Sequence, residues 1–147
     1  MTNAIDNASA RIQDIALAMT SVSIKSAPDY AIENADPCPF SVAWVGGGTF
    51  RATNATQMHN FPAINVEFHF SRINLKQTYQ QINAVVYEFS SRLAADPTLN
   101  GTVTTIVFGQ DAEIAYTVRP MEWGKVTTQM LMFTVPIKIL QTPQTTA

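Results

Sequence analysis

The sequence predicts an α+β fold in which a mainly antiparallel sheet carries two helices on one face. Two stretches place apolar residues at helical spacing, and several others alternate apolar with polar residues as strands do. Their order is helix, strands, helix, strands, and strands that follow one another in runs favour antiparallel pairing. Because 147 residues suffice for one hydrophobic core, we expect a single domain over residues 1–147.

The first helix is expected to follow Ser9, whose hydroxyl is a plausible N-cap. Residues 1–8 are small and polar, so we expect a flexible extension there. A short strand is predicted over Val22–Ser26. The apolar residues of the helix share one face: Ile12, Ile15, Ala16 and Met19.

Residues 27–39 contain three prolines and three acidic residues without a clean period, which predicts a long loop. Loops of this length in compact domains are usually functional or mobile. The next strand is expected over Phe40–Val45. The glycines at positions 46–48 then predict a hairpin turn, followed by a short returning strand.

The clearest strand of the chain is Ala63–Ser71. Its even-numbered residues from Ile64 to Phe70 are apolar and are expected in the core. Asn65, Glu67 and His69 point to the other face, toward solvent or a partner.

The second helix is expected to begin after Asn74, with Gln77 three residues later in the capping-box position. It ends at Asp96, because Pro97 disfavours the helical conformation in the residue before it and has no N–H to donate. The apolar residues of this helix form one stripe: Leu75, Tyr79, Ile82, Val85, Val86, Phe89 and Leu93.

Three further strands are predicted, over Thr102–Phe108, Glu113–Arg119 and Val126–Leu140. The last is apolar on both faces near its start, which a central position in the sheet or a subunit interface would explain. Pro136 indicates that one side of this strand is an edge at that point. The polar residues 141–147 are expected to be flexible.

The composition lies on the apolar side of an ordinary soluble protein, with 46% hydrophobic and 14% charged residues. We therefore expect some apolar surface to be covered by other subunits, although a monomer with a surface rich in Thr, Asn and Gln remains an alternative. The net charge of -2 and the absence of a basic run disfavour binding to a nucleic-acid duplex.

The sequence has no secretory signal and no apolar stretch long enough to span a bilayer. Its one cysteine, Cys38, cannot form an intrachain disulfide. Synthesis in a reducing cytoplasm is the expectation.

No set of residues predicts a catalytic, cofactor-binding or metal site, so we do not expect an enzyme. Glu67 and His69 lie about 7 Å apart on one strand face, without a marked pocket, so a solvated or interface pair is favoured over a catalytic dyad. Cys38 has no histidine near it to activate its thiol. Four aromatic residues could line a small-molecule pocket, although core or interface roles are favoured for them. They are Trp44, Trp123, Tyr116 and Phe133.

One stretch carries a more specific pattern. From Phe61 to Val103 the chain reads FPAINVEFHFSRINLKQTYQQINAVVYEFSSRLAADPTLNGTV. An alternating strand leads into an amphipathic helix, and the helix runs into Asp96-Pro97-Thr98-Leu99-Asn100-Gly101-Thr102-Val103. This stretch resembles the tail terminator proteins (tail tube terminator or minor tail proteins) of long-tailed bacteriophages, whose second helix commonly runs into D-x-T-L-x-G-T-V.

The resemblance implies a structural virion protein of the tail and neck, assembled in the host cytoplasm. Such a protein forms a ring, usually a hexamer, that caps the tail tube, stops its polymerisation and provides the surface for head–tail joining. Its partners would be other copies of itself, the tail tube protein and a head–tail connector (neck) protein, with DNA only passing through the lumen. The alternatives are another neck, connector or tail-completion protein, or a small ligand-binding domain.

Seven residues are candidates for contacts with another subunit or partner. Each is chosen for its place on a loop, a turn or a strand face, and ordinary core or solvated surface is the competing interpretation for each. The candidates are Tyr30, Glu67, His69, Arg72, Leu99, Met130 and Met132.

Overall fold

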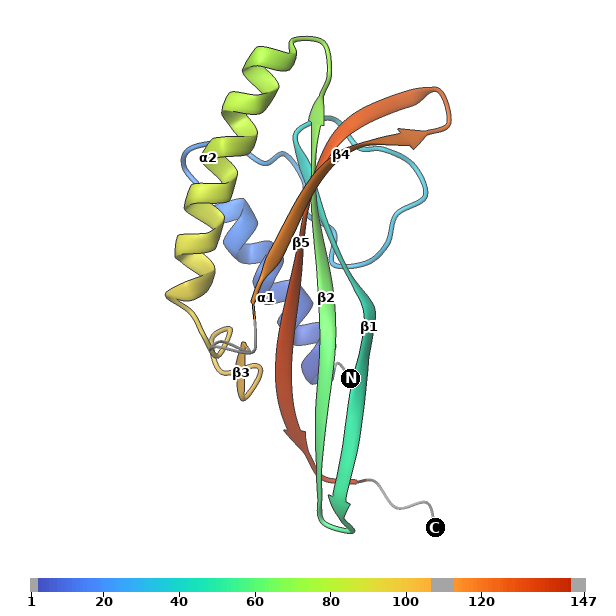
Figure 1. Ribbon diagram of the computed structural model, residues 1–147, viewed down its shortest axis with the longest axis vertical. Coiled ribbons are helices and arrows are strands. Elements are labelled where there is room, and N and C mark those ends of the chain that lie inside the picture. Colours follow the sequence, from blue (N-terminus) through green and yellow to red (C-terminus); the bar gives the residue numbers. More distant parts are fainter. Residues whose placement is uncertain (1–2, 107–112, 144–147) are drawn as a thin grey trace.

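The computed structural model describes residues 3–106 and 113–143 and shows the predicted α+β fold (Figure 1). All strand pairs are antiparallel, and β2 and β5 lie side by side at the centre of the sheet. β1 flanks β2, while β4 and β3 both pair with the other side of β5. The elements are α1 (Ala4–Ala18), β1 (Phe40–Asn54), β2 (Gln57–Ser71), α2 (Leu75–Ala94), β3 (Thr105–Ile106), β4 (Ala115–Trp123) and β5 (Val126–Gln141).

Both helices pack on one face of the sheet, which we call the helix face, and its opposite is called the outer face. The even-numbered residues of β2 from Ile64 to Phe70 lie on the helix face and are fully buried. Phe68 meets Phe89 of α2 with 5.0 Å between ring centroids, and Phe89 meets Phe133 of β5 at 4.9 Å. These edge-on and tilted aromatic contacts form the centre of the core.

Helix α1 begins earlier than the sequence analysis expected. Asn3 is the N-cap, and its side-chain oxygen accepts a hydrogen bond from the Asp6 N–H at 2.9 Å. Ala8 and Ser9 lie within the helix and are buried, so the prediction of a Ser9 cap after a flexible segment was wrong for residues 3–8, while residues 1–2 lie outside the described residues. Ala8 lies one turn before Ile12 and extends the apolar stripe of the helix toward the N-terminus. Because alanine is small and only weakly apolar, the sequence pattern did not reveal this extension.

The segment between α1 and β1 is tied to its neighbours without forming a strand. Val22 and Ile24 are buried, but no strand forms over Val22–Ser26, so that prediction was wrong. Instead, residues 25–28 follow the first residues of β1 through three backbone hydrogen bonds. They are Lys25 N–H to Pro39 O, Ser41 N–H to Ser26 O and Ala43 N–H to Pro28 O.

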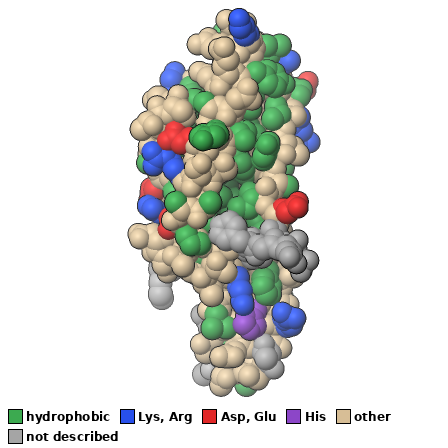
Figure 2. Space-filling model, turned by 60° about the vertical axis from the view of Figure 1, so that its left-hand side comes forward, with side chains coloured by type: hydrophobic (Ala, Val, Ile, Leu, Met, Phe, Trp, Pro, Cys, Tyr) green, Lys and Arg blue, Asp and Glu red, His purple; other side chains and the backbone are tan. Residues whose placement is uncertain are grey.

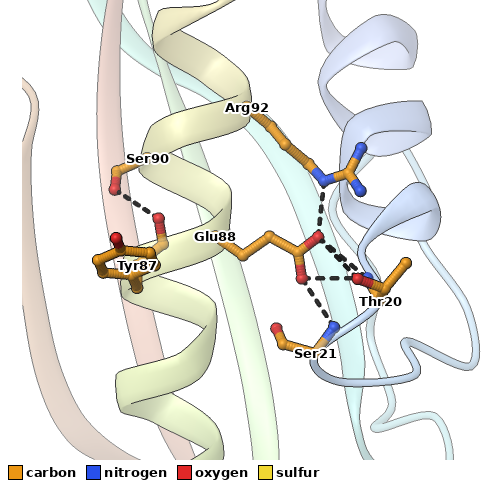
Figure 3. Close-up of polar contacts among 6 residues, drawn as sticks. All are labelled: Thr20, Ser21, Tyr87, Glu88, Ser90 and Arg92. Carbon is orange, nitrogen blue, oxygen red and sulfur yellow. Dashed lines mark hydrogen bonds and ion pairs between the residues drawn. The ribbon is translucent and has the colours of Figure 1, made fainter.

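A carboxylate on α2 anchors the chain where it leaves α1 (Figure 3). Glu88 accepts hydrogen bonds from the backbone N–H groups of Thr20 and Ser21 at 2.8–3.0 Å, and from Arg92 Nε at 2.7 Å. Burial alone would raise the pKa of Glu88, but the hydrogen bonds from Ser21, Thr20 and Arg92 outweigh it and lower the pKa to about 2. An ionised Glu88 therefore joins the two helices through the first residues after α1.

Strand β1 does not turn at its glycines. It continues to Asn54, and the hairpin turn lies between Asn54 and Gln57, so the predicted turn at 46–48 was wrong. Val45 pairs with Ile64 and Gly47 with Ala63, which leaves Gly46 as one extra residue, a β-bulge. At Gly48 a Cβ would lie 2.6 Å from the Phe61 carbonyl oxygen, so glycine here permits close strand approach.

The C-terminal strands follow the prediction in part. β5 has nearly the predicted bounds, and its central place between β2 and β4 accounts for its two apolar faces. Pro136 lies opposite the interval between β4, whose pairing ends at Thr134, and β3, whose pairing begins at Ile137. β4 starts two residues later than predicted and runs four residues further. Of the strand predicted over 102–108, the structure shows Thr105–Ile106, and residues 107–108 lie outside the described residues.

Helix α2 is the prediction that the structure matches most closely. Asn74 caps it and accepts a hydrogen bond from the Gln77 N–H at 3.2 Å. Ile82, Val85, Phe89 and Leu93 are buried as expected and Val86 is half-buried, but Leu75 and Tyr79 are 44% and 46% exposed. The N-terminal part of α2 thus carries apolar surface that the described residues do not cover. Of the tail predicted over 141–147, Gln141 belongs to β5, and 144–147 lie outside the described residues.

Candidate functional site

The structure separates the seven candidate contact residues into two groups. Four are buried by the chain itself: Glu67, His69, Leu99 and Met130, with at most 5% of their surface exposed. They cannot contact another subunit in this conformation, so that expectation is corrected. The other three remain accessible: Tyr30 is 64% exposed, Arg72 is exposed, and Met132 is half-buried.

Glu67 and His69 are buried because aromatic residues cover this part of the outer face. The Phe40 ring stacks on the His69 ring with 4.8 Å between centroids, and Trp123 packs edge-on to the same ring at 5.1 Å. Trp44 reaches Glu67 from β1. The alternating pattern correctly predicted that Glu67 and His69 point away from the helices. It could not predict their burial, because the aromatic rings that cover them come from distant parts of the sequence.

A continuous hydrogen-bond chain satisfies these buried groups. Trp123 Nε1–H donates to Thr128 Oγ1 at 3.1 Å, and Thr128 lies 2.7 Å from His69 Nδ1. His69 Nε2 lies 3.0 Å from Glu67 Oε1, and Trp44 Nε1–H donates to Glu67 Oε2 at 2.6 Å. The two ring nitrogens of His69 thus lie within hydrogen-bond distance of the Thr128 hydroxyl on one side and the Glu67 carboxylate on the other.

This chain contains a carboxylate, an imidazole and a hydroxyl, as nucleophilic sites do, but it is closed to a substrate. Thr128 is 1% exposed and His69 is fully buried. A recess of about 190 Å³ reaches Glu67 between Trp44 and Trp123, but His69 does not line it. Ligand pockets generally start at about 300 Å³, so the arrangement is that of a structural network.

Glu67 stays ionised inside this network. Burial alone would raise the pKa of Glu67, yet the hydrogen bonds from His69 and Trp44 and the charges of His69 and Arg119 together hold that pKa below its ordinary value. Glu67 thus acts as the fixed acceptor between β1 and β2.

Cys38 lies at an open recess of about 670 Å³ between the 35–38 segment, the end of β2 and the start of β5. Burial raises the pKa of the Cys38 thiol, although the charge of Lys25 opposes the shift. The thiol therefore stays protonated at neutral pH and is a poor nucleophile. Arg72 lines the same recess, where its Nε donates to Gln129 Oε1 at 3.0 Å.

The stretch from Asp96 to Gly101 forms a compact turn. Asp96 Oδ1 accepts from the Asn100 N–H, and Asp96 Oδ2 accepts from Arg11 Nε of α1, both at 2.9 Å. Leu99, Asn100 and Gly101 have φ angles of 47°, 57° and 80°, a left-handed path that returns Leu99 to the core. The visible role of this turn is to end α2 and hold it against α1.

On the helix face, the described residues leave open an apolar groove of about 340 Å³ between α2 and β4. We call it the α2/β4 groove. Figure 2 shows hydrophobic side chains running down the upper half of this side of the molecule. Tyr87 is 80% exposed at the groove, and Tyr116 is 53% exposed. The groove is lined by Tyr79, Ile82, Asn83, Val86, Tyr87, Ser90, Tyr116 and Val118.

A second accessible feature is the far end of the sheet, which we call the tip: Gly46–Ala63 of the β1–β2 hairpin and Thr134–Gln141 of β5. It extends beyond the helices at the lower end of Figure 1. Its charged or titratable residues are Arg51, His59 and Lys138, and its sequence contains no acidic residue. Phe50 is 70% exposed on the tip.

The sequence analysis did not predict either feature as a contact surface. One sequence signal pointed to the groove: Tyr87 lies outside the apolar stripe of α2, where an aromatic residue has no core to fill. No sequence pattern indicated the β4 side of the groove. Tyr116 and Val118 lie there only because β4 pairs with β5.

Within the described residues no cluster of His, Cys, Asp and Glu side chains is placed to hold a metal ion. Neither described helix combines the length and the apolar character needed to span a membrane. A scan against models of known protein families gave no match to this chain, and a search of curated proteins gave none either.

Proposed function

We propose that this chain is a structural virion protein that forms a hexameric ring capping the tail tube of a long-tailed phage. One observation carries the proposal: the helix face exposes aromatic side chains around the α2/β4 groove. Contiguous apolar surface on a small domain usually marks a contact with another macromolecule. Self-association in a ring would cover it.

The resemblance of Phe61–Val103 to tail terminators supports the choice of assembly. In the fold this stretch forms β2, α2 and the Asp96–Gly101 turn, the elements around which the rest of the domain is arranged. The accessible Tyr30 and Arg72 lie outside the groove and are candidates for contacts with tube or connector proteins.

The mechanism follows from a ring with two unlike faces. One face would dock on the last ring of tube protein, and the other would accept the connector but no further tube protein. Growth of the tube would stop there. The small net charge of -2 suits a lumen through which DNA passes without being held.

The test combines the state of association with tube capping. Light scattering on the purified chain over a range of concentrations should show a closed oligomer, and electron microscopy should show shorter tubes when the chain is added to polymerising tail tube protein. Tyr87→Ser should weaken association by about tenfold. Ser91→Ala, on an exposed position of the same helix, is the matched control and should leave association unchanged.

A strictly monomeric chain at high concentration, with no effect on tube length, would overturn the proposal. Particles that lack the protein discriminate between related roles. Over-long tubes assign the chain as a terminator, whereas full heads without attached tails assign it as a connector.

A further inference from the structure

Two strand edges are open on opposite sides of the sheet. On β1, residues 25–28 accompany only the first residues, up to Ala43. Beyond that point, no described residue pairs with the edge of β1 that points away from β2, from Gly46 to Asn54. The edge of β4 (Ala115–Trp123) that points away from β5 is likewise unpaired in the part of the chain that the structure describes.

These edges carry devices against strand pairing only over part of their length: the β1 edge begins at the Gly46 bulge, and the β4 edge carries Arg119, Pro120 and Glu122 in its second half. Natural edges are commonly blocked by prolines, charges or a covering loop. The Gly46–Asn54 edge has no proline and one charged residue, Arg51. The β4 edge has Pro120 and the charged residues Arg119 and Glu122, but the four residues from Ala115 to Val118 are free of both charges and prolines. Each edge spans nine residues.

The exposed side chains of the two edges lie on the same face of the sheet. Phe50 pairs with Asn60, which pairs with the buried Ile139, and this sequence of pairs places Phe50 on the helix face of the tip. Tyr116 pairs with Phe133 and Val118 with Leu131, which places both on the helix face at the α2/β4 groove. In a sheet that continues from β4 of one copy into β1 of another, these side chains would adjoin.

We propose that the Gly46–Asn54 edge of one copy pairs with the β4 edge of the next copy and seats Phe50 in the α2/β4 groove. The occupant is a second copy, because this chain itself supplies both an open strand of matching length and an exposed aromatic side chain on the required face. Backbone hydrogen bonds provide the pairing and the groove provides specificity, as in other strand-addition complexes.

The contact is heterologous, because it uses a different edge on each copy. Each addition leaves one edge free at either end, so the assembly closes into a ring or continues as a filament. This inference rests on the self-association proposed above and assigns its contact surfaces.

The test uses two charge variants and their mixture. Phe50→Asp blocks the tip edge, and Val118→Asp blocks the groove; each alone should be monomeric at concentrations where the parent chain associates. Mixed in equal amounts, they should form a dimer and nothing larger, since one intact tip meets one intact groove. Thr49→Asp and Thr117→Asp place the same charge on the outer face of the same strands and should still form the parent oligomer.

Hydrogen exchange of the parent chain adds a backbone readout. Amides of 46–54 and 115–123 should exchange at least about tenfold more slowly in the oligomer than in the dilute monomer. If the chain forms rings that cap tubes while these amides and both variants behave as the parent does, the strand pairing is wrong and the proposed function stands. If the variants dimerise as described but no tube is capped, the pairing stands and the tail function fails. Circular dichroism of each variant excludes loss of fold as the cause.

Discussion

At the scale of single residues, two carboxylates connect parts of the chain that are distant in sequence. Glu88 holds the backbone of Thr20 and Ser21 against α2, and Glu67 joins Trp44 to His69. In both cases the acceptor is ionised and its donors are fixed by the fold. Charge-assisted hydrogen bonds of this kind are stronger than those between neutral groups.

The Glu88 contact makes stability depend on pH. Its pKa is about 2 in the folded chain against an ordinary 4.5, so its contribution is fully present above pH 4.5 and is lost as pH falls toward 2. Glu88→Gln should lower the free energy of unfolding by about 1 kcal/mol at pH 7, since solvent weakens contacts at this accessible site, and by less at pH 3, as measured by urea denaturation.

The control for this change is Glu33→Gln, because Glu33 is exposed in the 27–39 loop. It should alter the free energy of unfolding little at either pH. An equal loss for Glu88→Gln at pH 7 and pH 3 would contradict an ionised role for Glu88.

The buried network predicts a different outcome for Thr128. Thr128→Val should cost about 1–3 kcal/mol, because His69 Nδ1 and Trp123 Nε1 would be left without partners away from water. Thermal or urea unfolding measures the loss. Thr127→Val, at the exposed neighbouring position, should be nearly neutral, and similar losses for both variants would argue against the network.

At the scale of elements, the glycines of β1 have unlike roles. Gly48→Ala should destabilise the tip by about 1–3 kcal/mol, because its Cβ would lie 2.6 Å from a carbonyl oxygen of the rigid partner strand. Gly47→Ala should be tolerated, since nothing lies within 4 Å of the added Cβ. Urea unfolding, with hydrogen exchange of the tip amides, measures both; equal effects would mean that close strand approach is not what position 48 requires.

The elements that could be predicted from the sequence have their signals nearby. The cap at Asn74 and the stop at Pro97 bracket α2, and strict alternation identified β5 and the Ala63–Ser71 part of β2, which begins six residues earlier, at Gln57. The errors arose where tertiary context decides. A run of glycines usually indicates a turn, but here Gly48 allows β1 to lie close to β2.

At the scale of the whole molecule, the candidate surfaces are composed of segments far apart in the sequence. The α2/β4 groove needs α2 and β4 to be brought together by β5, and the tip needs the ends of β1, β2 and β5. Composition predicted that some apolar surface would remain uncovered, but it could not locate that surface. The seven residues chosen from local pattern were mostly buried for the same reason: local pattern gives the direction of a side chain, not its cover.

The bulge at Gly46 has a consequence for a chain that lacks this residue. Before it, the odd-numbered residues of β1 face the helices, and after it the even-numbered ones do. The bulge accommodates Gly46 locally. Deletion of Gly46 would therefore leave Gly47 opposite Ala63 and keep Phe50 on the helix face. The side-chain directions of the tip should likewise stay unchanged, because the pairing beyond the bulge already continues in the register of Gly47 with Ala63.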